Sequence, residues 1–583
     1  MNRFGFDYGF GAQSTADGAI RFRLWAPDLQ AVQLERDGVG CTPMRSAGDG
    51  WFETALEVPA GTRYRYRLGA SDGQVVPDIG ARAQIGGALG WSVVVDPLSY
   101  AWRHPEWAGR PWHEAIVEEI HAGLLDGFDG VRARLPALAE TGISAIELMP
   151  VAEFPGPRNW GYDGVLPFAP DAAYGGPEAL KRLVDAAHGL GLMVLLDVVY
   201  NHFGPDGNYL PKYASAFFRT DAQTPWGPAI DVTRPEVGAF FLANARYWLE
   251  EYRCDGLRFD AAHAILDQGW LASLAAGIRD GASGRRVHLV LEHEGNAAGL
   301  LERGFDAQWN DDFHHALHVL LTGESEGYYA DFAEAAIEKL ARAWREGFAW
   351  QGEPSPYRGG APRGEPAAHL PPTAFVAFLQ NHDQIGNRAF GERLLALAPD
   401  GYAAALAFLL LSPQIPMLFM GEEYGEARPF LYFSAYQGDL AVAVREGRRR
   451  EFADFPEFAD GKQRARIPDP NDPATFTASR PEPLSGGPAR ARVAELIALR
   501  RREIVPWLDR SGGRSTEVVA EKALRASWRR EDGRVLHLHL NLGAESVVAP
   551  AMSGEPLYAS PDAAAVSLAQ GRLAPMSFVA CLA

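Results

Sequence analysis

Short stretches at the start of the chain alternate between hydrophobic and polar residues. Ile20–Trp25 alternates apolar with charged side chains, and Trp51–Leu56 and Tyr64–Leu68 continue the pattern with aromatic residues. A period of two is typical of a strand with one buried face, and the Gly, Pro and Asp residues between the runs indicate turns. The pattern predicts a small N-terminal β-sandwich over residues 1–98, which we expect to pack against the following domain.

From about residue 113 the pattern changes to short apolar runs separated by helical segments. One such segment is Pro177–Gly189, whose apolar residues share one face. Near-continuous apolar runs are typical of parallel strands that are covered on both faces. Eight repeats of strand and helix predict an α/β fold, a (β/α)8 TIM barrel over residues 99–505. The predicted strands are Ile116–Ile120, Ala145–Met149, Met193–Val198, Gly256–Phe259, Val287–Leu291, Asp306–Gln308, Ala374–Leu379 and Pro416–Phe419.

The remaining segments differ from both patterns. Residues 201–233 are rich in Gly and Pro and predict a long loop over the active face of the barrel, while 347–372 is either a second such loop or a flexible surface loop. The charge run Arg445–Arg450 predicts the solvated face of a helix. Alternation returns in Val535–Leu540, which predicts a small C-terminal β-domain over residues 506–583.

Composition narrows the class of protein. The 583 residues are 47% hydrophobic and 22% charged, as expected for a globular chain of several domains. A net charge of −19 argues against a nucleic-acid partner, because phosphate binding needs a basic surface. No signal-peptide core is visible, and the most membrane-like stretch, Tyr402–Met420, contains two prolines and predicts a buried helix followed by a buried strand.

The three cysteines, Cys41, Cys254 and Cys581, lie far apart and form neither a disulfide framework nor a metal-spaced cluster. We therefore expect a protein of the reducing cytoplasm, not bound to a membrane. No cofactor motif is present, and no metal site is assigned. The sequence predicts no particular oligomeric state.

Polar side chains follow four of the predicted strands. They are Asp197–His202, Arg258–Asp260, Glu292 and Asn381–Asp383. In a TIM barrel the carboxyl ends of the strands meet at one mouth, so these groups are expected to converge. Side chains two apart in a strand point the same way, so the Arg258 guanidinium favours the ionised form of Asp260. Taken alone, Asp260 is better explained as half of a structural ion pair with Arg258, and the other strand ends change that interpretation.

Several carboxylates at one mouth are the arrangement that glycoside hydrolysis needs. One stays ionised and attacks the anomeric carbon, while another stays protonated and gives its proton to the leaving oxygen. The four segments also resemble the signature regions of the α-amylase family of glycoside hydrolases. The resemblance implies that Asp260 is the nucleophile, Glu292 the general acid/base and Asp383 the stabiliser of the transition state, with retention of configuration. Glu294, two residues beyond Glu292, is a rival acid.

The resemblance also implies roles for the neighbouring residues. Arg258 would orient Asp260, His202 and His382 would contact sugar hydroxyls, and Asp197 would be a structural anchor. These roles require that Glu292 is protonated and Asp260 ionised, with a bell-shaped pH profile. Calcium binds some members of the broader family, but no calcium site is assigned in this chain.

Further segments follow the second, sixth and seventh strands. Tyr162 is placed to stack on a sugar ring, and Gln384 and Asn387 extend the seventh-strand motif. Acids and histidines within or near the same mouth are candidates for polar substrate contacts, although an Asp before a helix is also a normal N-cap. These candidates are Asp311, Asp312, His314, His315 and His263.

Together with Phe22–Pro27, these segments resemble one group of the α-amylase family, the maltooligosyltrehalose trehalohydrolases. The resemblance implies hydrolysis of the α-1,4 bond next to the terminal trehalose of maltooligosyltrehalose. Two alternatives remain open at this point. One is a glycogen branching or debranching enzyme with the same fold and carboxylates. The other is an amylase-like binding protein without activity, which would be expected to lack one of the carboxylates.

Overall fold

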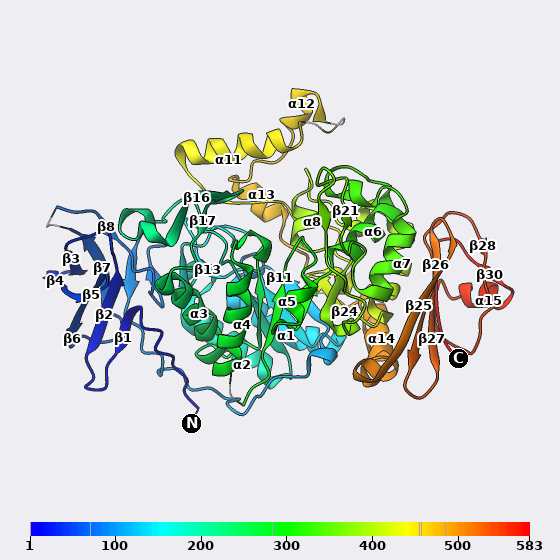
Figure 1. Ribbon diagram of the computed structural model, residues 1–583, viewed down its shortest axis with the longest axis horizontal. Helices are drawn as coiled ribbons and strands as arrows, with labels where there is room; N and C mark the ends of the chain where they lie inside the picture. The colour runs from blue at the N-terminus through cyan, green and yellow to red at the C-terminus, as the bar shows by residue number, and fades with distance from the viewer. Residues whose placement is uncertain (1, 70–71, 283, 454, 456–457, 484–485) are drawn as a thin grey trace.

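A closed barrel lies at the centre of the molecule, with antiparallel sheets at its two ends (Figure 1). The computed structural model describes residues 2–69, 72–282, 284–453, 455, 458–483 and 486–583. The N-terminal sheets lie at one end of the long axis and the C-terminal sheet at the other. Among the described residues, no helix is long and apolar enough to cross a membrane.

The barrel has eight parallel strands that pair in chain order, and the last pairs with the first. Each strand lies within one or two residues of the predicted run, so the predicted (β/α)8 fold is confirmed. The strands are β11 (Val117–Ile120), β12 (Ala145–Leu148), β15 (Met193–Val198), β18 (Gly256–Phe259), β19 (His288–Leu291), β20 (Ala307–Trp309), β23 (Phe375–Phe378) and β24 (Ile415–Phe419).

Alternate residues of these strands enter two different cores. One set, which includes Val117, Met193 and Val376, forms a separate cluster inside the barrel. The other set, which includes Ile120 and Leu196, packs with the surrounding helices in the main core. Because side chains alternate along a strand, this division fixes which polar residues at the strand ends point inward.

Helices surround the barrel as the apolar periodicity predicts. Helix α2 (Gly176–Gly189) coincides with the predicted segment, and α14 (Pro488–Glu503) lies after the eighth strand. Helix α10 (Pro399–Leu411) is apolar on all sides and almost completely buried. It contacts β27 (Val535–Asn541) and β31 (Ser577–Leu582) of the C-terminal sheet, which explains why no polar face is present.

The N-terminal module consists of two antiparallel sheets, β1-β2-β6-β5 and β4-β3-β7-β10-β9. It packs against helix α3 (Pro235–Glu250) of the barrel, as expected. Phe10 contacts Phe240 edge to face at 5.1 Å between ring centroids. Arg82 pairs with Glu251 at 3.0 Å, and both side chains are buried. The strands are β1 (Gly11–Ser14), β2 (Ile20–Trp25), β3 (Val32–Arg36), β4 (Gly40–Pro43), β5 (Arg45–Gly48), β6 (Trp51–Leu56), β7 (Arg63–Leu68), β8 (Val75–Val76), β9 (Gln84–Ile85) and β10 (Trp91–Val93).

The C-terminal sheet has the strand order β25-β26-β27-β31-β29. We propose that the three parts of the molecule are domains that meet near residues 98 and 505. The remaining strands of this sheet are β25 (Ser511–Ala520), β26 (Ala523–Arg530) and β29 (Glu555–Ser560).

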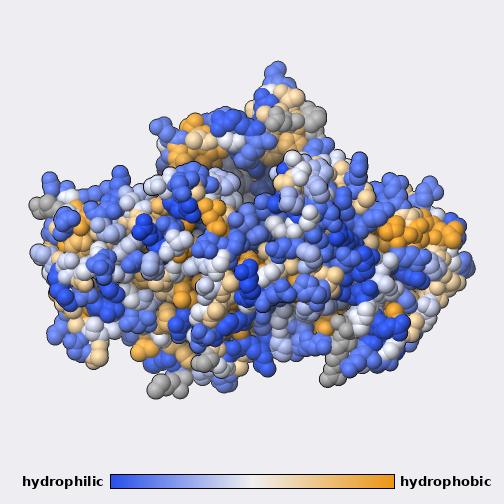
Figure 2. Space-filling view, viewed as in Figure 1, coloured by the Kyte–Doolittle hydropathy of each residue, from blue (hydrophilic) through white to orange (hydrophobic). Residues whose placement is uncertain are grey.

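Three excursions surround the mouth of the barrel. Each predicted long loop contains a hairpin: β16 (Phe218–Thr224) pairs with β17 (Gly227–Ile230), and β21 (Glu353–Pro354) pairs with β22 (Pro362–Arg363). The third excursion follows β24, and we call it the arch. Figure 1 shows it projecting above the barrel, and the space-filling view in Figure 2 shows a hollow beneath it. The arch contains α11 (Gly438–Glu451), α12 (Gly461–Arg464) and α13 (Pro473–Ala478).

Candidate active site

The centre of the site is the guanidinium of Arg258, which is fully buried in β18. Its Nη1 pairs with Asp197 and lies 3.1 Å from Oδ1 of Asp260. Its Nη2 lies 2.7 Å from Oε2 of Glu292, the residue after β19. The guanidinium carbon lies 4.0 Å from the centre of the Trp309 ring, a cation–π contact. One cation thus joins carboxylates from three neighbouring strands at the same rim.

Asp260 and Glu292 are close enough to influence each other's protonation. Burial alone would raise the pKa of Glu292, but the Arg258 guanidinium and the Ala261 N–H, 2.7 Å from Oε2, outweigh burial and lower that pKa. Burial and the Glu292 charge raise the pKa of Asp260 well above its usual range. In the unliganded protein, Arg258 and the Ala261 N–H therefore favour the ionised form of Glu292, whereas the order with Glu292 protonated and Asp260 ionised stays a prediction for the working enzyme.

Asp383 lies in the first turn of the short helix α8 (His382–Gly386), which begins after β23. Asn381 caps this helix by accepting the Asp383 N–H at 2.9 Å, while Gln384 Oε1 accepts the Asn381 N–H at 3.0 Å. This reciprocal pair is a capping box. Asn387 donates to Oδ1 of Asp383 at 3.4 Å. The cap therefore fixes the backbone position of Asp383, from which its carboxylate extends.

His382 is completely enclosed beside Asp383. Its backbone N–H and its Nδ1 both bond the carboxylate of Glu119, from β11, and its Nε2 lies 3.5 Å from Oδ1 of Asp383. The Tyr162 ring stacks on the imidazole at 5.0 Å between centroids. Burial by itself would lower the pKa of His382, but the Glu119 and Asp383 carboxylates outweigh burial and raise it to about 9. The ring is therefore charged at neutral pH.

The rim is completed by residues from the second and third strands. Tyr162 donates its hydroxyl to Asp197 at 2.7 Å, so Asp197 is held by both Tyr162 and Arg258. Asn201 donates to Oδ2 of Asp260 at 2.7 Å. His202 Nε2 lies 3.0 Å from the Tyr162 carbonyl oxygen, and burial lowers the pKa of His202 to about 4. His202 is therefore neutral, in contrast to His382.

A pocket of about 170 Å³ opens beside these carboxylates. Among the residues predicted to touch substrate, it is lined by Asp311, His315, Gln384 and Asn387, together with Glu292 and Asp383. Burial and the Glu292 charge raise the pKa of Asp311 to about 8. The pocket is also lined by residues that the sequence did not single out, namely Tyr328, Tyr357, Arg358 and Arg363.

Glu294 lines the same pocket but differs from Glu292 in its surroundings. Its side chain is 56% exposed and pairs with Arg358 at 3.1 Å, on the rim of the pocket. The Glu292 side chain is 18% exposed and contacts the Arg258 cluster. Only Glu292 shares a guanidinium with Asp260, which favours Glu292 over its rival as the acid.

Two predicted substrate contacts lie beneath the pocket. The Asp312 carboxylate is completely buried and is saturated by Asn296, the Ala349 and Trp350 N–H groups and Arg363. His314 is also buried, with its Nε2 3.1 Å from the Tyr329 hydroxyl. Because their polar atoms are occupied by protein groups, we no longer expect Asp312 and His314 to contact substrate. They support the loops that carry the pocket.

His263 lies on the other side of Glu292, in the short turn η6 (Ala262–Ala264) after β18. Its ring lies 5.8 Å from that of His293, and its charged form would lower the pKa of Glu292. His263 therefore lies near the proposed acid, and its contact with substrate stays a prediction.

A second pocket of about 430 Å³ continues from the first, because Tyr328, Gln384 and Asn387 line both. It lies between the segment around Tyr328, the segment after α8 and the part of the arch that carries Phe452 and Gln463, beyond the end of α11. Four phenylalanines are among the residues that line it, namely Phe390, Phe452, Phe455 and Phe458. Flat apolar faces of this kind are suited to stack on sugar rings.

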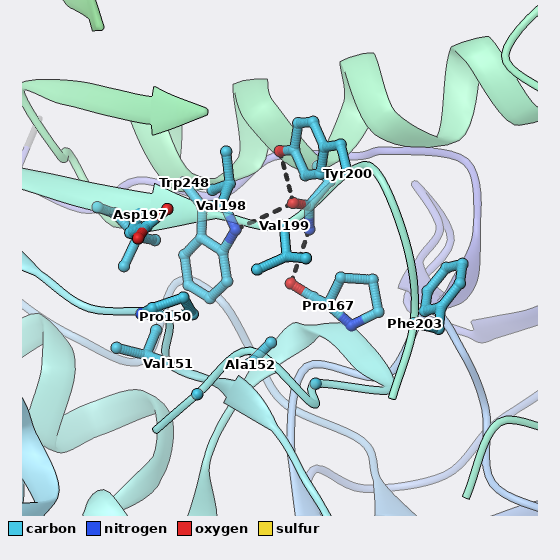
Figure 3. Close-up of a pocket in the computed structure, with 14 residues that line it drawn as sticks. Pro150, Val151, Ala152, Pro167, Asp197, Val198, Val199, Tyr200, Phe203 and Trp248 are labelled. Atoms are coloured by element: carbon cyan, nitrogen blue, oxygen red, sulfur yellow. Dashed lines mark hydrogen bonds between the residues drawn. The ribbon is translucent and has the colours of Figure 1, made fainter. Parts of the chain in front are cut away.

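A much smaller cavity of about 20 Å³ lies behind Asp197 (Figure 3). Asn244 holds its wall together, because its side-chain oxygen accepts from the Tyr200 hydroxyl at 2.7 Å and from the Trp248 ring nitrogen at 3.1 Å. Its amide donates to the Pro167 carbonyl at 2.8 Å. The cavity is too small for a sugar, so we assign it to the support of the rim.

Glu119 is the main site residue that sequence reasoning missed. It lies within the apolar run of β11, where the adjacent acids Glu118 and Glu119 are both buried. Two acids inside a buried strand are costly unless they are neutral or paired, and this was the available signal. Burial and the nearby Glu423 raise the pKa of Glu118 well above its usual range, so Glu118 is neutral.

Within the part of the chain that the structure describes, no group of three or more His, Cys, Asp or Glu side chains is arranged to hold a metal ion. The acids at the rim are compensated instead by Arg258 and His382.

Comparisons with known proteins agree with this geometry. The family model for the catalytic domain of alpha amylase matches residues 117–226, and that for a domain of unknown function (DUF3459) matches residues 511–580. A malto-oligosyltrehalose trehalohydrolase from a Rhizobium species is 39% identical over 97% of this chain and 98% of the relative. Another, from Deinococcus radiodurans, is 41% identical over 81% of this chain and 78% of the relative.

Among solved structures, one described as a putative alpha amylase from Salmonella typhimurium has a TM-score of 0.93. It is 45% identical and covers 99% of this chain and all of its own. A pullulanase from an Anoxybacillus species has a TM-score of 0.70 at 17% identity and shares only the fold. Because the identity with the trehalohydrolases extends over nearly the whole length of both chains, this chain belongs to the malto-oligosyltrehalose trehalohydrolase family, within the α-amylase family of glycoside hydrolases.

Proposed function

We propose that this protein hydrolyses the α-1,4-glucosidic bond next to the terminal trehalose of maltooligosyltrehalose and releases free trehalose. The family relationship supports the substrate class. One observation carries the chemistry: Asp260 and Glu292 share the buried guanidinium of Arg258, and Glu292 shares a pocket with Asp383. These contacts support the proposal that the three carboxylates surround a single glucose unit.

The proposed roles follow from these positions. Asp260 is the nucleophile, because Asn201 and Arg258 direct its two oxygens. Glu292 is the general acid and then the general base, because it borders the adjoining pocket. Asp383 faces the same position from α8 and stabilises the positive charge that develops on the sugar. We propose that two carboxyl groups this close give retention of configuration.

The proton that Asp260 and Glu292 share must move during substrate binding. In the unliganded protein, Arg258 and the Ala261 N–H favour ionised Glu292, as described above. We propose that the bound sugar displaces Glu292 from these donors, which raises its pKa. Developing positive charge at the anomeric carbon then favours ionised Asp260. The pair thus reaches the protonation that its roles require only when substrate is present.

We propose that the remaining site residues lie on the two sides of the glucosidic bond that is cleaved. Tyr162 contacts both His202 and His382 at the rim that carries Asp260, and these three residues are proposed to hold the glucose that becomes attached to it. Glu292 gives its proton to the leaving group, so trehalose is proposed to occupy the pocket that Glu292 lines. Asp311, His315, Gln384 and Asn387 contribute polar groups to that pocket.

A product assay tests the substrate. The protein is incubated separately with maltooligosyltrehalose, amylose and a branched glucan, and the products are separated by chromatography. We expect trehalose from the first substrate and little turnover of the others. A branching enzyme from Nocardia farcinica is 34% identical over 43% of this chain, so transfer or debranching is the specific alternative. New branches or linear chains from the glucans would overturn the proposal.

We also propose that the protein works in the cytoplasm without nucleic-acid partners. Cys41, Cys254 and Cys581 are all unpaired, and Cys41 is exposed. An exposed free thiol is typical of a reducing compartment. The net charge of −19 is consistent with a neutral oligosaccharide partner.

A further inference from the structure

We propose that Glu119 is a positioning residue for the reaction: its carboxylate holds the His382 ring and the first turn of α8 so that Nε2 of His382 is directed at Asp383 and the bound sugar. The inference rests on the proposed catalytic role of Asp383. Glu119 lies in the first barrel strand and His382 follows the seventh, so the contact spans 263 residues of sequence.

The geometry of the contact is specific. One carboxylate oxygen of Glu119 accepts the His382 backbone N–H at 3.0 Å, and the other bonds Nδ1 of the same residue. Both side chains are 1% exposed, so water does not compete for either bond. Because Nδ1 is occupied by Glu119, only Nε2 remains free to act toward Asp383, at 3.5 Å.

The packing around the ring allows few other orientations. Tyr162 stacks on one face of the imidazole, and Trp160 meets it edge to face at 5.6 Å between centroids. A rotation of the ring would leave the buried carboxylate of Glu119 without a partner, which is costly. Glu119 therefore fixes the ring, and through the backbone N–H it fixes the start of the helix that carries Asp383.

No other charged group near His382 combines a charge interaction with two hydrogen bonds to His382, as Glu119 does, among the residues that the structure describes. Glu147 is adjacent on β12, but burial raises its pKa well above the usual range and leaves it neutral. Arg258 opposes a positive charge on His382. The titratable and charged groups that act on the His382 ring are Glu119, Glu147, Asp197, Glu292, Asp383, Arg258 and His121. Of these, Glu119 is the one that also forms two hydrogen bonds with His382.

The test compares Glu119→Gln with Glu119→Asp in the full-length protein. Gln keeps the shape of Glu but removes the charge and presents an NH₂ group to one of the two His382 donors. We expect kcat to fall about 10- to 100-fold with a smaller change in KM, and the basic limb of the kcat profile to move to lower pH. The Asp variant keeps the charge and should retain the basic limb of the wild type.

Glu118→Gln is the matched control, because Glu118 is the next residue in the same strand and is already neutral. It should leave kcat and the pH profile as in the wild type. A Gln variant at position 119 that loses thermal stability but keeps the wild-type basic limb would overturn the inference. Absence of trehalose release by the wild type in the same assay would instead reject the proposed function.

Discussion

At the scale of single residues, the site depends on how one buried cation is shared. Arg258 is completely inaccessible and contacts Asp197, Asp260 and Glu292. A buried charge is tolerated only when it is paired and hydrogen-bonded, so each carboxylate depends on the same partner. The arrangement couples the protonation of the proposed nucleophile to that of the proposed acid.

Glu292 and Glu294, which lie two residues apart, offer a direct test of which residue is the general acid. Replacing Glu292 by Gln should lower kcat by about 10²- to 10⁴-fold, because a general acid contributes on that scale. Replacing Glu294 by Gln should change kcat less than about 10-fold, because Glu294 is an exposed group paired with Arg358. Steady-state trehalose release by both variants is the measurement. A larger loss at Glu294 than at Glu292 would exchange their roles.

The charged state of His382 also contributes to stability. Its pKa is raised from 6.5 to about 9 in the folded protein, so the fold binds this proton more tightly than the unfolded chain does. The resulting stabilisation, about 3 kcal/mol, is fully present below pH 6.5 and is lost as the pH rises through about 9.

The free energy of unfolding of the wild type should therefore exceed that of Glu119→Gln most clearly at pH 6, and the difference should shrink above pH 9. Denaturant titrations at several pH values measure it. A difference that stays constant from pH 6 to pH 10 would show that the charge of His382 adds nothing to stability.

The convergence of the residues at the strand ends could be predicted from the sequence, because the alternation of side chains and the geometry of the barrel determine where these residues meet. Asp260, Glu292 and Asp383 follow this rule and converge on one rim. The ionised form that the unliganded protein favours for Glu292 could not be predicted, because it depends on the Ala261 N–H, a backbone donor whose direction no side-chain pattern reveals. Asp312 was assigned to the pocket because a buried acid and an exposed acid look alike in sequence.

At the scale of secondary structure, the short helix α8 carries much of the site. Its last carbonyls, at Gly386 and in the segment after it, are satisfied by Arg448 from α11 of the arch. Arg448 is 7% exposed, so the prediction of a fully solvated charge run is wrong at this position. The run forms a helix, as predicted, but one of its arginines attaches the arch to α8.

Replacing Arg448 by Met should loosen α8. The variant leaves the Gly386 and Arg388 carbonyls without their donor, at a cost of about 1–3 kcal/mol. We expect faster hydrogen exchange in the peptide that contains α8 and a fall in kcat/KM for trehalose release. Arg449→Met is the control, because Arg449 pairs on the surface with Glu446 at 3.2 Å. Unchanged exchange in the Arg448 variant would show that the arch does not support α8.

The barrel strands were predictable because most of them are short, mainly apolar runs, and several are followed by polar residues. Short elements such as α8 and the β21–β22 hairpin could not be predicted in this way, because they contain too few residues to show a hydrophobic period. Their positions depend instead on long-range contacts, such as those of Asp331 with Ser355 and Arg363.

At the scale of the whole molecule, two β-rich ends enclose one barrel. The fold class of the three parts and their order could be predicted from the change of hydrophobic period along the chain. The docking of the N-terminal module on the barrel could not be predicted, because it includes the contact of Arg82 with Glu251, which are 169 residues apart. That ion pair is almost completely buried, and Lys181 lies 3.4 Å from the same carboxylate.

Replacing Arg82 by Met should destabilise this junction by about 3 kcal/mol, because a buried carboxylate loses its main partner. We expect a lower unfolding temperature, with kcat retained at temperatures where the protein remains folded. The matched control is Arg45→Met, since Arg45 is 73% exposed and its pair with Glu53 lies on the surface of the module. Equal unfolding temperatures for the two variants would contradict the proposed contribution of the buried pair.

The excess of carboxylates around Arg258 has a consequence for inhibition. Asp197, Asp260 and Glu292 contact Arg258, while Glu119 and Asp383 contact His382, so the carboxylates around the site outnumber these two cations. A cyclic amine that is protonated at neutral pH would place its positively charged ring nitrogen beside these carboxylates, which outnumber the positively charged side chains of the site. Such a compound is attracted by the same imbalance that stabilises the reacting sugar, whereas an uncharged analogue of equal shape gains nothing from it.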